Sequence, residues 1–385
     1  MNALSNALSE DIQQQIEGLL ATPTFALEPG EHEARLLAVL RLELGYAAER
    51  SSQLRRYLDD WPVDYRVAAR IAELPYLPVG AFKANPPLSL VAPESIVRTL
   101  ASSATTGQMP SRVVLDAPTS KRMVKGVAAI ISDFIGPKRR PYLVIDTPQT
   151  LAGQGGELGA RGAAIQGLRP FATDIVCCLK ADAAGALEID EDRLFDFVAR
   201  WGKSEVLVYG FTYVVWQHFV LPLRAKGIAL DLPNLRLLHS GGWKRLLDQA
   251  VTREAFAGGV AGVFGCDPAR VLDFYGMVEN VGIIYPDCEQ GNKHAPAFGA
   301  VIVRDPLTLQ PVEAGRQGLV QVCSVLPSSF PGFLVLTDDI AEVIRYDGCE
   351  CGRRGICFRF VKRVPKTEVR GCGNVETTRQ RPQTV

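Results

Sequence analysis

The chain alternates between segments in which apolar residues recur at helical spacing and short, continuous apolar runs. Residues 1–60 are predicted to be mostly helical, because an amphipathic run follows Ser9 and apolar residues recur at helical spacing from His32 to Leu44. Further along, runs rich in β-branched residues are separated by helical patterns, which predicts buried parallel strands covered on both faces of a sheet. The predicted strands of this sheet are residues 142–145, 204–209, 235–238 and 270–274.

The pattern changes at Ala297, where short strands separated by Gly and Asp turns begin. They predict a smaller, mostly antiparallel β region with strands at 299–303, 318–325 and 341–346. We therefore expect an α/β protein. Its expected parts are a helical N-terminal segment (1–60), an α/β core (61–296), a small β-rich subdomain (297–363) and a short tail (364–385).

The loop from Ala101 to Arg112 is the clearest local sign of chemistry. It carries several hydroxyl side chains and a glycine, ends in a cation, and leads into the apolar run 113–115. Hydroxyls, free backbone N–H groups and a guanidinium are suitable donors to phosphate oxygens, although the Gly-Lys-Ser/Thr ending of a Walker A loop is missing. A Ser/Thr-rich surface turn is the alternative interpretation. The candidate phosphate-binding residues are Ser102, Ser103, Thr105, Thr106, Gly107 and Arg112.

Two further segments lie where predicted parallel strands end, at the edge of the sheet where ligands collect. One strand is followed by His239, Ser240 and the glycine pair Gly241 and Gly242. The two glycines allow the backbone to approach a flat ring closely. After the other come Tyr275 and Gly276, where the aromatic ring can lie against a purine. Ordinary strand-to-helix turns would also explain both segments.

Three thiols and one imidazole form a second candidate constellation. Cys288, His294, Cys349 and Cys351 make a Cys₃His set, which suits a tetrahedral Zn²⁺ ion in a structural site. The spacing alone is weak evidence, because the two pairs lie far apart in the chain and Cys-x-Cys is tighter than the usual Cys-x₂-Cys. Four unrelated loop residues are the alternative.

Composition narrows the class of protein. The chain has 385 residues, 47% of them hydrophobic, and a formal net charge of zero, so no electrostatic argument favours a nucleic acid or an anionic membrane as partner. Neither a signal peptide nor a transmembrane segment is expected. Nine cysteines without a secretory signal predict thiols and metal ligands in a reducing, cytoplasmic setting.

Four segments in the right order resemble the adenylate-forming enzymes. The loop 101–112 is similar to their Thr-Ser-Gly-Thr-Thr-Gly-x-Pro-Lys signature, with Ala104 in place of a glycine and Arg112 in place of the lysine. The later segments that resemble this superfamily are 274–279 (Tyr-Gly-x-Thr-Glu), 336–339 (Thr-Gly-Asp), and 360–363 with 369–371 (the Gly-Arg hinge).

Within that superfamily, the chain most resembles the LuxE-type acyl-protein synthetases. These are also called long-chain-fatty-acid–luciferin-component ligases, and they are related to the phenylacetate–CoA ligases. The narrower resemblance extends from about Trp61 to the C-terminus, and the segments that carry it are 74–79, 82–83, 239–244 and 370–373.

The resemblance implies a set of nucleotide contacts. ATP and Mg²⁺ are the expected cofactors, with adenine held at Gly241, Gly242, Tyr275 and Gly276. Glu279 matches the glutamate that binds Mg²⁺ in that superfamily. Asp339 matches the carboxylate that binds the ribose hydroxyls, and Arg363 matches an arginine that also contacts the nucleotide. A carboxylate suits a vicinal diol because two acceptors face two donors.

The resemblance also raises two expectations about the C-terminal region. Adenylate-forming enzymes usually continue with a further domain of roughly a hundred residues that brings a catalytic lysine, and we expect this domain to be absent here, as it is in LuxE-type proteins. Cys372, flanked by glycines and preceded by Arg370, matches the cysteine that accepts the acyl group in those proteins. Cys357 looks like a buried strand residue and is the less suitable acceptor. Some relatives of phenylacetate–CoA ligase hold a structural zinc with similar residues.

The expected function is therefore the ATP-dependent conversion of a carboxylic acid, with a fatty acid as the expected substrate, to acyl-AMP, followed by transfer to Cys372 and delivery to a partner reductase. Arg112, His239 and Cys372 are the candidate catalytic residues. Two alternatives remain: an acyl-CoA ligase of the phenylacetate type, and a nucleotide-binding scaffold in a reductase complex.

Overall fold

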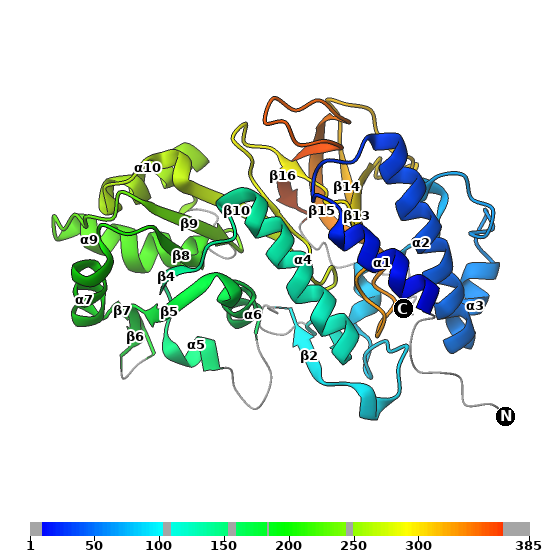
Figure 1. Ribbon diagram of the computed structural model, residues 1–385, viewed down its shortest axis with the longest axis horizontal. Coiled ribbons are helices and arrows are strands. Elements are labelled where there is room, and N and C mark those ends of the chain that lie inside the picture. The colour runs from blue at the N-terminus through cyan, green and yellow to red at the C-terminus, as the bar shows by residue number, and fades with distance from the viewer. Residues whose placement is uncertain (1–9, 103–108, 153–158, 183–184, 244–248, 365–385) are drawn as a thin grey trace, which may run out of the picture.

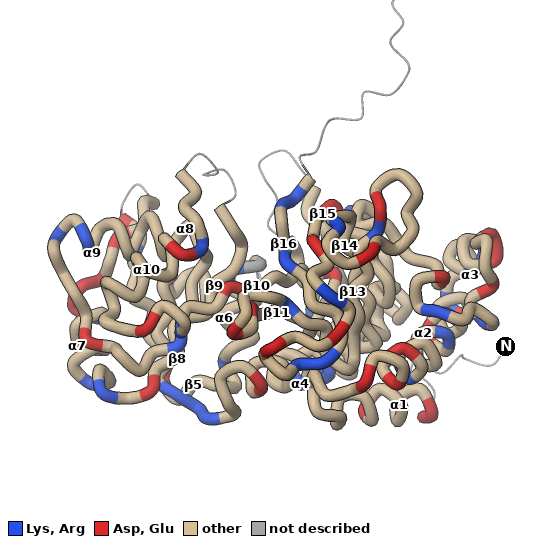
Figure 2. The backbone as a smooth tube through the Cα atoms, turned by 90° about the horizontal axis from the view of Figure 1, so that it is seen from above, with Lys and Arg blue, Asp and Glu red and all other residues tan. Residues whose placement is uncertain are grey.

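Two β-sheets lie side by side, each with its own apolar core (Figure 1). The computed structural model describes residues 10–102, 109–152, 159–182, 185–243 and 249–364. Basic and acidic residues are interspersed along the whole backbone (Figure 2), in keeping with the zero net charge. The expected α/β class is confirmed.

Helices dominate the N-terminal region, as the apolar spacing predicts. One face of the first helix buries Ile12, Ile16 and Leu19. The second begins with a proline in its first turn, and the third is capped by Ser51, whose hydroxyl accepts a hydrogen bond from the Leu54 N–H at 3.2 Å. The three helices are α1 (Glu10–Ala21), α2 (Pro29–Arg50) and α3 (Ser52–Asp59).

The first sheet is parallel except at one edge, and its strand order is β11-β10-β9-β8-β4-β5. All four strands predicted from the apolar runs occur in it, as β4, β8, β9 and β10. The strands are β4 (Arg140–Val144), β5 (Ala172–Cys177), β8 (Val206–Phe211), β9 (Leu235–Ser240), β10 (Val271–Gly276) and the antiparallel β11 (Ile284–Pro286).

Short helices and a β-hairpin connect the strands of this sheet. The hairpin pairs β6 (Leu179–Ala181) with β7 (Leu187–Ile189). The helices are α5 (Pro148–Ala152), α6 (Ala160–Gly167), α7 (Glu191–Trp201), α8 (Thr212–Val215), α9 (Leu221–Ala225) and α10 (Arg253–Phe264). This arrangement brings the carboxyl ends of β4, β8, β9 and β10 to one edge of the sheet, where ligands collect in such folds.

The second sheet is antiparallel, with the order β12-β16-β15-β14-β13, and β1 pairs in parallel with β15. Its longest strand begins earlier than the predicted segment 341–346, so that residues 336–339 lie within a strand. The strands are β1 (Leu77–Pro78), β12 (Lys293–His294), β13 (Gly299–Arg304), β14 (Gln317–Ser324), β15 (Leu334–Arg345) and β16 (Cys357–Arg363).

Helix α4 (Ala117–Ile135) runs between the two halves and contributes to both cores. Ile130 packs in one core, and Ile131 and Ile135 pack in the other. The Asp116 carboxylate caps the helix by accepting the Thr119 N–H at 2.8 Å. The helix follows the paired strands β2 (Arg98–Ala101) and β3 (Arg112–Leu115), in which Ala101 is paired with Arg112, so the two ends of the loop of interest at 101–112 lie side by side.

Candidate functional site

A carboxylate, a guanidinium and a phenol meet where the two sheets adjoin. Asp339 on β15 exposes only 1% of its surface, and Arg363 on β16 is its cross-strand partner. The Arg363 Nε donates to Asp339 Oδ1 at 2.7 Å and its Nη2 donates to Oδ2 at 3.2 Å. The hydroxyl of Tyr275, on β10 of the other sheet, donates to Asp339 Oδ2 at 2.8 Å. Three residues that the sequence predicted as nucleotide contacts therefore form one hydrogen-bonded cluster.

Electrostatics and stacking hold this cluster in place. The hydrogen bond and charge of Asp339 raise the pKa of Arg363 above its ordinary value, so the guanidinium stays charged. Burial raises the pKa of Tyr275, and the Asp339 charge acts in the same direction, so the phenol remains a donor. The Tyr275 ring stacks with Tyr285 at 5.8 Å and with Phe360 at 5.3 Å between ring centroids.

Glu279 lies in the turn after β10 and is 4% exposed. The pKa of the Glu279 carboxyl is raised above its ordinary value by burial. The hydrogen bond from the Ser111 side chain acts in the opposite direction but does not outweigh burial. Ser111 also closes the base of the 101–112 loop, because its N–H donates to the Ser102 hydroxyl at 2.9 Å and its carbonyl accepts the Ser102 N–H at 2.9 Å. The predicted phosphate loop and the predicted Mg²⁺ residue are thus adjacent.

Only the two ends of this loop are among the described residues. Ser103, Thr105, Thr106 and Gly107 lie outside the described residues, as does Cys372. Arg112 begins β3 and is half-buried, and its Nε has no hydrogen-bond partner among the described residues. Sequence reasoning did not include Ser111, although a hydroxyl directly before Arg112 was a usable signal.

The glycine pair after β9 has a clear steric reason. Gly241 and Gly242 have φ values of +86° and +56°, in the left-handed region that favours glycine. A Cβ atom on Gly241 would lie 2.7 Å from the Phe211 ring. Because β9 and β10 are neighbours, this tight turn and Gly276 lie at the same edge of the sheet.

His239, one residue before the end of β9, is buried with 6% of its surface exposed. Its Nδ1 lies 3.0 Å from the Thr212 hydroxyl, and its ring lies 4.4 Å from the Phe256 ring between centroids. Burial lowers the pKa of His239 to about 4. The ring is therefore neutral at ordinary pH, and Thr212 is a contact that no sequence signal suggested.

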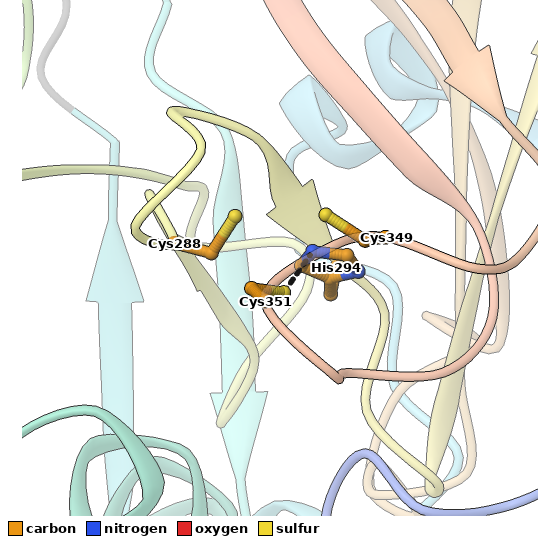
Figure 3. Close-up of side chains that lie close together, drawn as sticks. All are labelled: Cys288, His294, Cys349 and Cys351. Atoms are coloured by element: carbon orange, nitrogen blue, oxygen red, sulfur yellow. Dashed lines mark hydrogen bonds between the residues drawn. The ribbon is translucent and has the colours of Figure 1, made fainter.

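The four predicted metal ligands converge in the structure (Figure 3). One ligand atom from each of Cys288, His294, Cys349 and Cys351 lies within 4.8 Å of every other, and His294 Nε2 is 3.4 Å from the Cys351 sulfur. Cys288 lies between β11 and β12, His294 is the last residue of β12, and the other two come from the turn before β16.

The donor set fits a structural zinc ion. His294 Nδ1 is buried and has no hydrogen-bond partner among the described residues. Burial lowers the pKa of His294 to about 4, so the ring is neutral, as an imidazole ligand must be. Three sulfurs and one nitrogen would complete the tetrahedral coordination of such an ion and leave no position for a substrate. Cys357, at the start of β16, is fully buried and packs with Cys288 and Cys349.

No helix in the described part of the chain combines the length and the apolar character that are needed to cross a membrane.

Comparison with known proteins gives matches in family, sequence and structure. The family model described as "Acyl-protein synthetase, LuxE" matches residues 12–379. The long-chain-fatty-acid–luciferin-component ligase of Vibrio harveyi is 31% identical over 140 residues, and that of Aliivibrio fischeri is 27% identical over 143 residues. In each case the match spans 36% of this chain and 36% of the relative, so that this chain covers about a third of the relative's length.

Among solved structures, an open conformation of 2-hydroxyisobutyryl-CoA ligase in complex with 2-HIB-AMP and CoA has a TM-score of 0.67 at 16% identity. The likeness covers 89% of this chain and 77% of that one. The same ligase in its postadenylation state has a TM-score of 0.65 at 16% identity, over 88% and 69% of the two chains. At this identity the likeness concerns the fold.

Proposed function

Because the chain belongs to the LuxE family of acyl-protein synthetases, we propose that it uses ATP to activate a carboxylic acid as acyl-AMP. The observation that carries this proposal is the cluster of Tyr275, Asp339 and Arg363. This buried carboxylate accepts three hydrogen bonds from Tyr275 and Arg363, and because its two oxygens offer about four lone-pair sites, it keeps capacity for one hydroxyl of a vicinal diol. The ribose of ATP supplies such a diol.

In the proposed first step, a carboxylate oxygen of the substrate attacks the α-phosphorus of ATP. The bond to the bridging oxygen breaks, and pyrophosphate leaves with the electron pair. Donors of the 101–112 loop, together with Arg112, stabilise the charge on the phosphates, and Glu279 is suited to bind Mg²⁺. Mg²⁺ neutralises the phosphate charge when it is bound.

In the proposed second step, the Cys372 thiolate attacks the acyl carbonyl, so that a thioester forms and AMP leaves. In the sequence this cysteine stands between two glycines and two positions after Arg370, a context that suits a reactive thiolate. Cys357 is a poor alternative, because it is fully buried and burial raises the pKa of its thiol to about 12. The acyl group would then pass to a partner reductase. A fatty acid is the substrate that the names of the two luciferin-component ligases suggest.

We also propose that Cys288, His294, Cys349 and Cys351 hold a structural Zn²⁺ ion. The support is the convergence of four ligand atoms from two distant segments. The ion would join β12 and the segment before it to the turn before β16.

ATP–pyrophosphate exchange against a panel of carboxylic acids tests the proposed adenylation, because the assay reports acyl-AMP formation whatever the acceptor. Acid-dependent exchange is the expected result, with the best acid identifying the substrate class. Absence of exchange with every acid, in protein that binds ATP, would favour the nucleotide-binding scaffold. Efficient release of acyl-CoA would favour a ligase of the phenylacetate type.

A further inference from the structure

Lys293 carries a charge that is buried between the two sheets. It lies on β12 and exposes 2% of its surface. Its Nζ donates to Asp273 Oδ2 at 3.0 Å and to Asp287 Oδ1 at 2.9 Å, and the Arg253 Nη2 lies 3.3 Å from Asp287 Oδ2. Two carboxylates and two cations thus balance one another. A buried cation of this kind stays charged only because its partners compensate for the lost hydration.

Asp273 is shared between Lys293 and His239. Asp273 and His239 are paired residues on the neighbouring parallel strands β10 and β9, so their side chains lie on the same face of the sheet. The second carboxylate oxygen, Oδ1, is 3.6 Å from His239 Nδ1. Burial acts to raise the pKa of Asp273, but Lys293 and His239 outweigh it and lower the pKa below its ordinary value. Asp273 is therefore an ionised acceptor beside the His239 ring.

Two neighbours of His239 Nδ1 favour a proton on that nitrogen. The ionised Asp273 carboxylate, which only accepts hydrogen bonds, has its Oδ1 3.6 Å away. The Thr212 oxygen lies 3.0 Å away, and it can accept from Nδ1–H when its own proton goes to the Ser240 carbonyl at 3.1 Å. In this arrangement Nε2 keeps its lone pair.

We propose that Lys293 is a positioning residue of the adenylation site: by sharing Asp273 with His239, it keeps the His239 ring neutral, with its proton on Nδ1. In a catalytic triad an unshared aspartate stabilises the imidazolium. Here the charge of the aspartate is already taken up by Lys293, so the ring gains little from protonation. The inference concerns how the proposed function uses His239 and therefore rests on that function.

The charged groups around His239 support a neutral ring. Burial lowers its pKa to about 4; Lys293 and Arg253 act in the same direction, and Asp273 alone among the named groups opposes them. Arg253 comes from α10, Asp273 from β10 and Lys293 from β12. His239 consequently adds no positive charge to a site that must hold phosphates. It offers Nε2 as a hydrogen-bond acceptor and a flat face that packs on Phe256.

Nitrogen-15 NMR of the imidazole rings in the full chain tests the inference without relying on activity. The protein has four histidines, so the spectrum is simple, and a His239→Gln variant assigns the signal. We expect the wild-type ring to be neutral with a protonated Nδ1 from pH 6 to pH 8, values that bracket the ordinary range for histidine. An Nε2–H tautomer, or titration of His239 near its ordinary value, would overturn the proposal even if the Lys293 variants failed to fold.

Lys293→Met tests the role of the lysine. Asp273 then has no cation of its own, and the titration midpoint of His239 should rise by about one to three pH units. Lys293→Arg should restore the wild-type midpoint. Lys125→Met is the matched control, because Lys125 pairs with Glu17 at the exposed surface. A folded Lys293→Met protein with an unchanged His239 signal would refute the assignment.

Two further measurements separate this inference from the other proposals. Lys293 is adjacent to His294, so the zinc content of Lys293→Met must equal that of the wild type for the NMR comparison to count. Pyrophosphate exchange is recorded in parallel. Absence of exchange in the wild type would refute the adenylation function and leave the tautomer result standing, whereas exchange together with the wrong tautomer would refute only the role of Lys293.

Discussion

The hydroxyl of Tyr275 donates a hydrogen bond to Oδ2 of Asp339 across the junction of the two sheets, at 2.8 Å. Tyr275 lies on the parallel sheet and Asp339 on the antiparallel one. This contact ties the two halves of the candidate nucleotide site together, and it orients a carboxylate that Arg363 holds from its own sheet.

Replacing Asp339 tests the assignment of the ribose contact. Asp339→Asn removes the charge but keeps the size, and it should weaken ATP binding by roughly 1.5–3 kcal/mol, because a charged hydrogen-bonding partner is lost. Isothermal titration with ATP and pyrophosphate exchange measure the effect. Asp338→Asn is the matched control, since Asp338 is the half-buried neighbour of Asp339. Equal ATP affinity in folded Asp339→Asn and wild-type protein would contradict the assignment.

The sequence predicted part of this site because the relevant residues stand in short, ordered segments. The apolar runs at 142–145 and 235–238 identified two of the central strands, and the residue order 274–279 followed by 336–339 pointed to the nucleotide contacts. Strand periodicity of this kind depends on neighbours in the chain, so it is visible without the fold.

The charge network around Lys293 was not predictable in the same way. Its members come from β9, β10, α10 and the segment around β12, and each looks like an ordinary charged residue in its own segment. Only the packing of the two sheets brings Asp273 and Asp287 to the same ammonium group. The fourth thiol of this region, Cys357, was likewise recognised as buried but not as a neighbour of the metal ligands.

Zinc analysis tests the proposed metal centre. The purified protein should contain about one zinc per chain, and changing both Cys349 and Cys351 to Ser should lower the zinc content and the thermal stability together, because metal binding contributes to folding. Cys266→Ser is the matched control, because Cys266 is a partly exposed thiol outside the cluster. Metal-free wild-type protein that unfolds at the same temperature with and without added zinc would mean that the four residues have no metal role.

Acid stability should depend on His239. Its pKa is lowered to about 4 in the folded protein, below the ordinary value of about 6.5, so between these values the unfolded chain binds a proton that the folded chain does not. The free energy of unfolding should therefore fall as the pH drops from about 6.5 to 4, by roughly 3 kcal/mol from this residue.

Urea unfolding of the wild type and of His239→Gln at several pH values measures this contribution. The glutamine variant should lose less stability on acidification, while groups common to both proteins, including the neutral His294, cancel in the comparison. Parallel curves for the two proteins would show that His239 is not the source of the acid sensitivity.

The transfer step is tested at Cys372, which separates an acyl-protein synthetase from a CoA ligase. The motivation is a cysteine between two glycines in the segment that resembles the acyl-accepting segment of LuxE-type proteins. Cys372→Ser should leave pyrophosphate exchange nearly intact, because the thiol takes no part in adenylation. It should abolish hydroxylamine-sensitive labelling of the protein by radioactive acid plus ATP, since the hydroxyl is a far weaker nucleophile than the thiolate. Cys266→Ser, with a partly exposed thiol whose pKa is raised by burial, should label like the wild type. Continued labelling of Cys372→Ser would exclude this acceptor, and a wild type that makes acyl-CoA and never labels would favour the ligase.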